Sequence, residues 1–147
     1  IELLPQADRE GTAVLVSAHG LPQRVADRGD PYPAEIVGSM EGVLERIPYG
    51  VDARLGYQSR TGPIRWMGPG TEEVIDAFAA EGRKALVVLP IAFVSDHIET
   101  LYETDILFRD RAVAAGITTY LRVPMLNDGR EVGSILADVV EPALGTT

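Results

Sequence analysis

Hydrophobic and polar positions follow one another along the chain in blocks that predict four strands separated by helices. The segments 13–18, 52–59, 84–93 and 118–123 are expected to form strands, and the run at 84–93 is apolar on both faces, as in a central strand. Strands that alternate with helices favour right-handed crossovers. The pattern therefore predicts an α/β fold, a three-layer sandwich with a parallel four-stranded sheet and helices on both faces.

Helical spacing and helix boundaries mark the segments between the strands. Helices are expected at residues 33–47, 71–82, 98–115 and 132–144, and Thr71 is expected to cap the second of them. In the first helix, the expected buried stripe consists of Val37, Met40, Val43, Leu44 and Ile47. The long helix at 98–115 is expected to be amphipathic, with Gly116 at its end.

The length of the chain suits one domain over residues 1–147, which is large enough to bury roughly 70% of the surface of its unfolded chain. The sequence shows no internal repeat and no second domain. It begins without methionine, and we expect it to be a piece of a longer protein.

Charge and cysteine content exclude several function classes. A formal net charge of −9 argues against nucleic-acid binding, which needs a basic surface, although it suits either a cationic substrate or simple solubility. Because the chain has no cysteine, it cannot hold an iron–sulfur cluster through cysteine or a thiolate zinc site, so any metal needs nitrogen and oxygen ligands. No apolar run is long enough to span a bilayer and no signal peptide is visible, so we expect a cytoplasmic protein.

Reactive side chains gather where the predicted strands end. His19 ends the first strand, Ser59 ends the second, and His97 follows the third. His19 and His97 are the only histidines in the chain. Parallel strands share one carboxyl edge, where open α/β sheets bind ligands. Glu99 and Glu103 follow on the next helix, four residues apart and therefore on one face.

These side chains favour two kinds of chemistry. Imidazole and carboxylate suit a divalent first-row metal such as Fe²⁺ or Zn²⁺, and imidazole also accepts a proton near neutral pH. A lone histidine at a strand end is often a structural, hydrogen-bonded residue, and that alternative stays open. Trp66, the only tryptophan, is expected either to fill the core or to form a wall for a flat aromatic ligand.

Several blocks of the sequence resemble the motifs of the ferrochelatase family, which inserts Fe²⁺ into a porphyrin at the end of haem biosynthesis. They are SAHGLP at 17–22, RGDPYP at 28–33, QSR at 58–60 with Trp66, and PIAFVSDHIETLYE at 90–103. The blocks occur in the family's order and cover nearly the whole chain. The family's fold has two similar α/β halves around a porphyrin cleft, and this chain resembles the second, C-terminal half.

The resemblance implies a role for each candidate residue. His19 is expected to accept a pyrrole proton or to touch the metal, and Glu99 to face it as metal ligand or base. Glu103 is expected to continue the metal site, with Asp96 and His97 orienting that corner. The residues expected at the porphyrin are Tyr32, Trp66, Gln58 and Ser59. No cofactor is required, since Fe²⁺ is a substrate.

The partners implied are a porphyrin, ferrous iron and the missing N-terminal half of the enzyme, with peripheral membrane contact left open. We expect the isolated domain to be inactive. One departure from the family lies at Leu107, where many relatives carry a third carboxylate of an acidic path. Two alternatives remain: a chelatase acting on sirohydrochlorin or another tetrapyrrole with Co²⁺ or Ni²⁺, and a non-catalytic metal- or haem-binding module.

Overall fold

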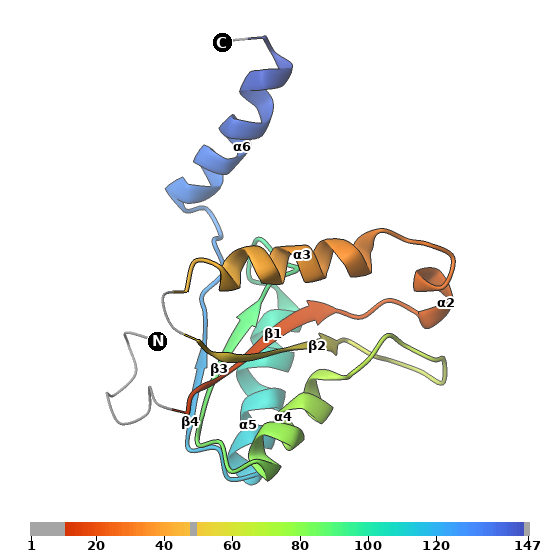
Figure 1. Cartoon of the computed structure of the whole chain (residues 1–147), viewed down its shortest axis with the longest axis vertical. Coiled ribbons are helices and arrows are strands. Elements are labelled where there is room, and N and C mark those ends of the chain that lie inside the picture. The colour runs from red at the N-terminus through yellow and green to blue at the C-terminus, as the bar shows by residue number, and fades with distance from the viewer. Residues whose placement is uncertain (1–10, 48–49, 146–147) are drawn as a thin grey trace.

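The computed structural model describes residues 11–47 and 50–145, and these contain one parallel sheet. Its strands are β1 (Ala13–His19), β2 (Asp52–Gln58), β3 (Ala85–Pro90) and β4 (Thr119–Arg122). They lie in the order β2-β1-β3-β4, and every pairing is parallel (Figure 1). The apolar run predicted as a central strand is β3, which lies between β1 and β4.

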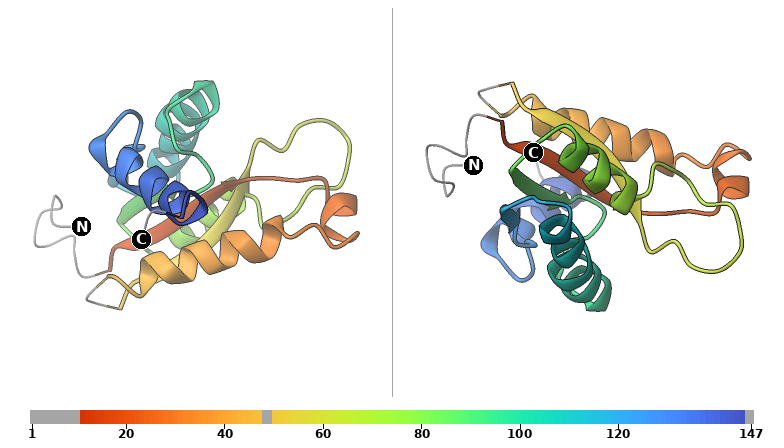
Figure 2. Two further views of the ribbon diagram at one scale, coloured as in Figure 1. Left: turned by 90° about the horizontal axis from the view of Figure 1, so that it is seen from above. Right: turned by 90° about the horizontal axis from the view of Figure 1, so that it is seen from below.

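Helices lie on both faces of this sheet, so the predicted α/β sandwich is confirmed. After the short α2 (Gln23–Ala26), α3 (Tyr32–Leu44) covers one face (Figure 2). The other face is covered by α4 (Thr71–Ala80) and by α5 (Phe108–Ala114), which continues a π-helix, η1 (Glu99–Leu107). The last helix is α6 (Arg130–Ala143).

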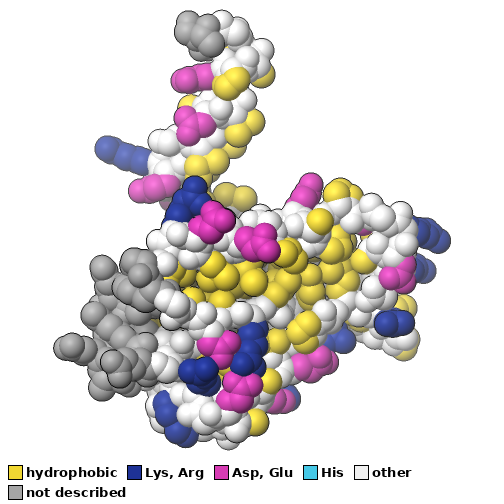
Figure 3. Space-filling model, in the orientation of Figure 1, with side chains coloured by type: hydrophobic (Ala, Val, Ile, Leu, Met, Phe, Trp, Pro, Cys, Tyr) yellow, Lys and Arg dark blue, Asp and Glu magenta, His cyan; other side chains and the backbone are white. Residues whose placement is uncertain are grey.

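The larger part of the core lies between the sheet and the α4–α5 pair. There Leu15 and Leu86 of the two central strands pack against Ile75 and Phe78 of α4 and Phe108 of α5. A smaller cluster on the opposite face joins Val14, Val16 and Val87 of the sheet with Met40 of α3. In Figure 3 hydrophobic side chains form a band along the side of α3 that faces the sheet.

The stripe predicted for α3 is partly wrong. Ile36 is the buried residue of this helix, at 6% exposure, whereas Val37 is 41% exposed and Val43 is 36% exposed. Met40, as predicted, packs on the sheet, four residues after Ile36. Ile36 and Val37 are adjacent and both apolar, so the sequence pattern does not show which of the two faces the sheet.

Two helix termini also differ from the sequence expectation. Gly70, and not Thr71, is the N-cap of α4, and its N–H donates to the Glu73 carboxylate at 3.0 Å. The segment expected as one amphipathic α-helix at 98–115 begins as a π-helix, which has i→i+5 hydrogen bonds. Its buried residues are the polar Thr100 and Thr104.

Helix α6 projects away from the sheet (Figure 1). No residue within it is buried, and its apolar side chains are largely exposed, including Val139 at 70% and Leu136 at 59%. The sequence correctly predicts this helix, but within the described chain it covers neither face of the sheet.

Candidate functional site

The carboxyl ends of the strands meet at one edge of the sheet, as the parallel pattern predicts. In the strand register His19 pairs with Gln58, and Ser17 pairs with Pro90 near the end of β3. The segment after β3 then leads into η1, which carries Glu99 and Glu103. Residues more than eighty positions apart in sequence therefore share this edge.

Four side chains at this edge form a continuous polar chain. His19 Nδ1 lies 3.1 Å from Glu99 Oε2. The Ser59 hydroxyl lies 2.9 Å from that same oxygen and 3.0 Å from Glu103 Oε2. The side chains of His19 and Glu99 are 37% and 35% exposed, so the outer end of this chain of contacts is accessible from solvent.

Ser59 links the two carboxylates. Its hydroxyl has a single proton and can donate to only one of them at a time, while its backbone N–H donates to Glu103 Oε2 at 3.0 Å. The residue has φ of +61°, in the left-handed region that residues other than glycine rarely adopt. Such conformations cluster at functional sites because the surrounding structure must hold them in place.

Burial raises the pKa of the Glu103 carboxyl above its ordinary value, and the nearby Glu99 carboxylate adds to the rise. The hydrogen bonds from Ser59 and the field of His19 act in the opposite direction. Two carboxylates this close disfavour being charged together unless a cation or a proton lies between them. The cluster is therefore suited to hold either.

Buried polar side chains behind the cluster position it. Ser17, 0% exposed, donates to Gln58 Oε1 at 2.8 Å, and Gln58 Nε2 lies 3.4 Å from Glu103 Oε2. Tyr32 donates its hydroxyl to the backbone carbonyl of His19 at 2.9 Å. Tyr32 thus supports the backbone of His19 from behind.

The other residues expected at this corner lie beside the cluster. Phe93 packs its ring against both histidines, with centroid distances of 6.2 Å to His19 and 4.3 Å to His97. The Glu99 N–H donates to His97 Nδ1 at 3.3 Å. Asp96 is held by Arg122 at 2.8 Å and does not join the four-residue chain of contacts.

A cleft of about 450 Å³ adjoins the cluster. Its lining includes Gln58, Ser59, Trp66, Glu103 and Leu107, whereas Tyr32 is not part of it. Trp66 is half-buried and donates its indole N–H to Thr61 O at 3.0 Å, so it forms a wall of the cleft and does not belong to the main core. Leu107, at 41% exposure, lies at the cleft and not in a buried stripe.

Within residues 11–47 and 50–145, no group of three or more histidine or acidic side chains has the arrangement of a formed metal site. Metal binding by His19, Glu99 and Glu103 therefore stays a prediction. Across the same residues, no helix is long and apolar enough to cross a membrane.

Three residues near the site were not singled out from the sequence: Arg122 and Asn127, which bind Asp96, and Thr100, which binds His97. Functional side chains are expected where parallel strands end, and this strand-end rule identifies His19, Ser59 and His97 at the first three strands. Applied to the fourth strand, the same rule would have marked Arg122, which ends β4.

The chain is similar in sequence and in fold to known proteins. The ferrochelatase family model matches residues 2–144. The chain is 42% identical over 139 residues to a ferrochelatase of Geotalea daltonii, covering 95% of this chain and 43% of that relative. It is 42% identical over 141 residues to a mitochondrial ferrochelatase of Homo sapiens, covering 95% and 33%. The chain thus spans less than half the length of these relatives.

A solved structure with a similar fold is a putative cobalamin (vitamin B12) biosynthesis CbiX protein from Marinobacter aquaeolei VT8. The TM-score is 0.66 at 15% identity, and the match covers 92% of this chain and 99% of that one. At that identity the likeness concerns the fold alone, and it supports the α/β architecture with a parallel sheet. Because the family model matches nearly the whole chain and the relatives align along 95% of it, the chain belongs to the ferrochelatase family.

Proposed function

We propose that this chain is the C-terminal half of a two-half ferrochelatase and contributes one wall of a site that inserts Fe²⁺ into a porphyrin. The observation that carries the proposal is the chain of contacts from His19 through Glu99 and Ser59 to Glu103 at the carboxyl edge of the sheet. It combines a base that is accessible to solvent with two carboxylates that are unfavourable when both are ionised at the same time.

Porphyrin metallation replaces two pyrrole N–H protons with one divalent metal ion, so the site needs acceptors for two protons. When Nδ1–H of His19 donates to Glu99, the Nε2 atom carries a lone pair that can take a pyrrole proton. Glu99 stabilises the resulting imidazolium. Ser59 and Glu103 continue the polar path inward, and the raised pKa of Glu103 suits it to receive the second proton.

The same carboxylates suit the incoming metal. Fe²⁺ accepts imidazole nitrogen and carboxylate oxygen ligands. A metal that is a substrate must also leave its ligands, so a loose set formed by His19, Glu99 and Glu103 fits transfer better than a closed structural site does. Trp66 would present its ring to a flat macrocycle in the adjoining cleft, which Gln58 and Ser59 also line.

The substrates of the whole enzyme follow from this proposal. They are ferrous iron and a porphyrin, protoporphyrin or coproporphyrin, and the other half of the enzyme supplies the second wall. We place the enzyme in the cytoplasm, although the relatives include mitochondrial forms.

Substitution of His19 and of Glu99 by alanine in the complete enzyme tests the proposal. Each variant is expected to lose on the order of 10²–10⁴ in metal-insertion rate, the usual effect of losing a general base, while its melting temperature changes little because both side chains are partly exposed. The matched control is Glu41→Ala, an exposed glutamate on α3, which should insert metal at the wild-type rate. Near-normal turnover by both site variants would refute the assignment, and preferred turnover of sirohydrochlorin over porphyrin would favour the alternative chelatase.

A further inference from the structure

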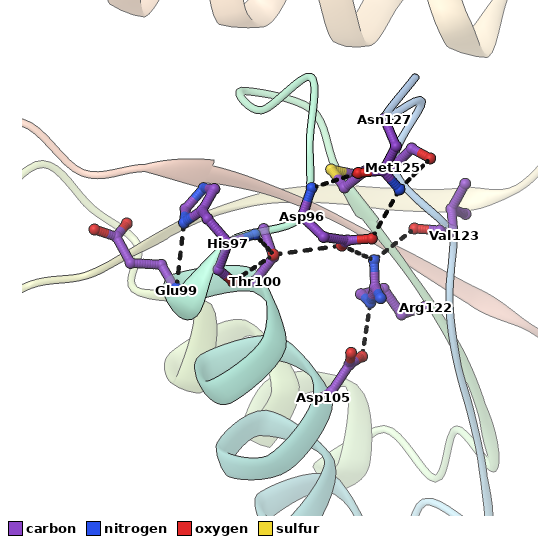
Figure 4. Close-up of polar contacts among 9 residues, drawn as sticks. All are labelled: Asp96, His97, Glu99, Thr100, Asp105, Arg122, Val123, Met125 and Asn127. Atoms are coloured by element: carbon purple, nitrogen blue, oxygen red, sulfur yellow. Dashed lines mark hydrogen bonds and ion pairs between the residues drawn. The ribbon is translucent and has the colours of Figure 1, made fainter. Parts of the chain in front are cut away.

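Arg122 ends β4 and forms ion pairs with two carboxylates on different segments. Its Nη1 atom lies 2.8 Å from Asp96, in the segment after β3, and its Nε atom lies 2.6 Å from Asp105, on η1 (Figure 4). The Arg122 side chain is 14% exposed, and the two aspartates are 24% and 25% exposed. One side chain therefore ties the site-bearing segment and the π-helix to the end of the sheet.

Asn127 binds the same segment from a second direction. Its side-chain oxygen accepts the Asp96 N–H at 2.8 Å, and its amide donates to Asp96 Oδ2 at 3.0 Å. Its own N–H donates to Val94 O at 2.9 Å. Asn127 has φ of +51°, which asparagine tolerates better than most residues, and glycine in its place would keep the backbone but lose both side-chain bonds to Asp96.

Asp96 passes this restraint to the histidine and glutamate that follow it. Asp96 Oδ1 lies 3.4 Å from the hydroxyl of the fully buried Thr100, which accepts the His97 N–H at 2.9 Å. His97 in turn accepts the Glu99 N–H on Nδ1. Figure 4 shows this succession running from Arg122 and Asn127 through Asp96 and Thr100 to Glu99.

We propose that Arg122 and Asn127 are positioning residues, which hold Asp96 so that His97 and Glu99 begin the π-helix in the place where Glu99 meets His19. Neither residue belongs to the four-residue chain of contacts. The effect on metal binding rests on the proposed function, whereas the positioning of the segment does not. Groups that orient metal ligands commonly contribute 10-fold to 100-fold to metal affinity.

The test uses the full 147-residue chain with Zn²⁺ as the probe, titrated by calorimetry. Arg122→Gln is expected to weaken Zn²⁺ binding about 10-fold to 100-fold. Arg122→Lys keeps the charge but lacks the fork that reaches both aspartates. Its Zn²⁺ affinity should therefore lie between those of Arg122→Gln and the wild type. Arg54→Gln is the matched control, because Arg54 also bridges two carboxylates, Asp52 and Glu81, yet lies on β2 away from the site. It should lower the melting temperature without changing Zn²⁺ affinity.

Amide hydrogen exchange gives a second readout that needs no metal. The Leu101 N–H donates to His97 O in the first turn of the π-helix. In Arg122→Gln its exchange should accelerate at least tenfold relative to the amides of β3, and Asn127→Gly should do the same with less effect on folding. Arg54→Gln should leave the ratio unchanged.

The outcomes separate this inference from the proposed function. If the wild-type chain binds no Zn²⁺, the metal assignment of the site fails, and the exchange ratio alone decides whether the positioning role holds. An unchanged ratio in both site variants overturns the inference, as does Zn²⁺ affinity within threefold of wild type in Arg122→Gln. Faster exchange at Leu101 supports it when Arg122→Gln also weakens Zn²⁺ binding, or when the wild-type chain binds no Zn²⁺ at all.

Discussion

At the scale of single residues, Ser59 is the residue on which the site depends. It contacts both carboxylates through one hydroxyl and holds a left-handed backbone conformation. Because the single hydroxyl proton can be donated to only one carboxylate at a time, the other carboxylate lacks this hydrogen bond. A substrate proton or a divalent cation completes the cluster, which agrees with a site that takes up either one in turn.

Glu103→Gln tests the protonation of this cluster without any substrate. Burial raises the pKa of Glu103 in the folded protein, so its protonated form is favoured there, and the native state loses stability as pH rises and the group ionises. Glutamine stays neutral and can still accept the bonds from Ser59. The variant should therefore melt about 1–3 °C higher than wild type at neutral pH, the shift given by less than about 1 kcal/mol in a domain of this size.

The pH dependence supplies the control for this prediction. Below the ordinary glutamate pKa of 4.5 both proteins carry a neutral group at this position, so the difference in melting temperature should disappear. It should grow as pH rises above that value. A glutamine variant that is less stable than wild type at neutral pH would show that charged Glu103 stabilises the fold.

Some residues of the site can be recognised from the sequence because they lie at the ends of strands. His19, Ser59 and His97 were found because each follows a recognisable strand. Arg122, the partner of Asp96, was not found, because their contact joins positions 26 apart that only the sheet order brings together. Sequence spacing contains no information on such a pair until the strand order is known.

At the scale of the element, η1 is where the sequence misleads most. Glu99 and Glu103 suggested an ordinary amphipathic α-helix, but this segment buries Thr100 and Thr104 and exposes Leu101 and Ile106. Thr104 Oγ1 is buried without a hydrogen-bond partner among the described residues. A helix with its polar residues inside and apolar residues outside conflicts with the hydrophobic pattern, and tertiary contacts at the site decide its form instead.

Leu107→Glu tests whether the cleft beside η1 lies on a metal path. Leu107 lines the cleft with Glu103 and is 41% exposed, so a glutamate there remains in contact with water. We expect a stability change within about 0.5 kcal/mol, typical of a surface substitution. We also expect tighter binding of Zn²⁺ or a lower metal concentration for half-maximal rate in the complete enzyme.

Leu107→Gln is the control, since it adds similar polar bulk without charge. A gain in metal binding by the glutamate variant alone would support a carboxylate path that ends at Glu103 in the natural chain. Equal metal binding by wild type and both variants would mean that the metal reaches Glu99 by another route.

At the scale of the whole molecule, the fold has a core of its own, yet the site is open. The main cluster between the sheet and α4 and α5 lies entirely within residues 13–120. By contrast, His19 and Glu99 are more than one-third exposed at the sheet edge, and α6 exposes an apolar side. The chain also spans 43% or less of the first two relatives compared above. The proposal that this chain is one half of a larger enzyme accounts for these three observations together.

The last prediction is that the 147-residue chain folds by itself but does not insert metal into a porphyrin at the rate of a complete two-half enzyme. The core needs no partner, whereas a flat macrocycle needs two walls to be bound and distorted, and binding that supplies such strain comes from the whole cleft. Circular dichroism and a cooperative melting curve test the folding, and Zn²⁺ or Fe²⁺ insertion tests the activity.

A chain ending at Gly129, without α6, is the control for stability. Because no residue of α6 is buried, it should melt within a few degrees of the full chain. Insertion by the isolated chain at the rate of a complete enzyme would mean that one wall is enough, and the two-half proposal would then fail even though the family assignment stands.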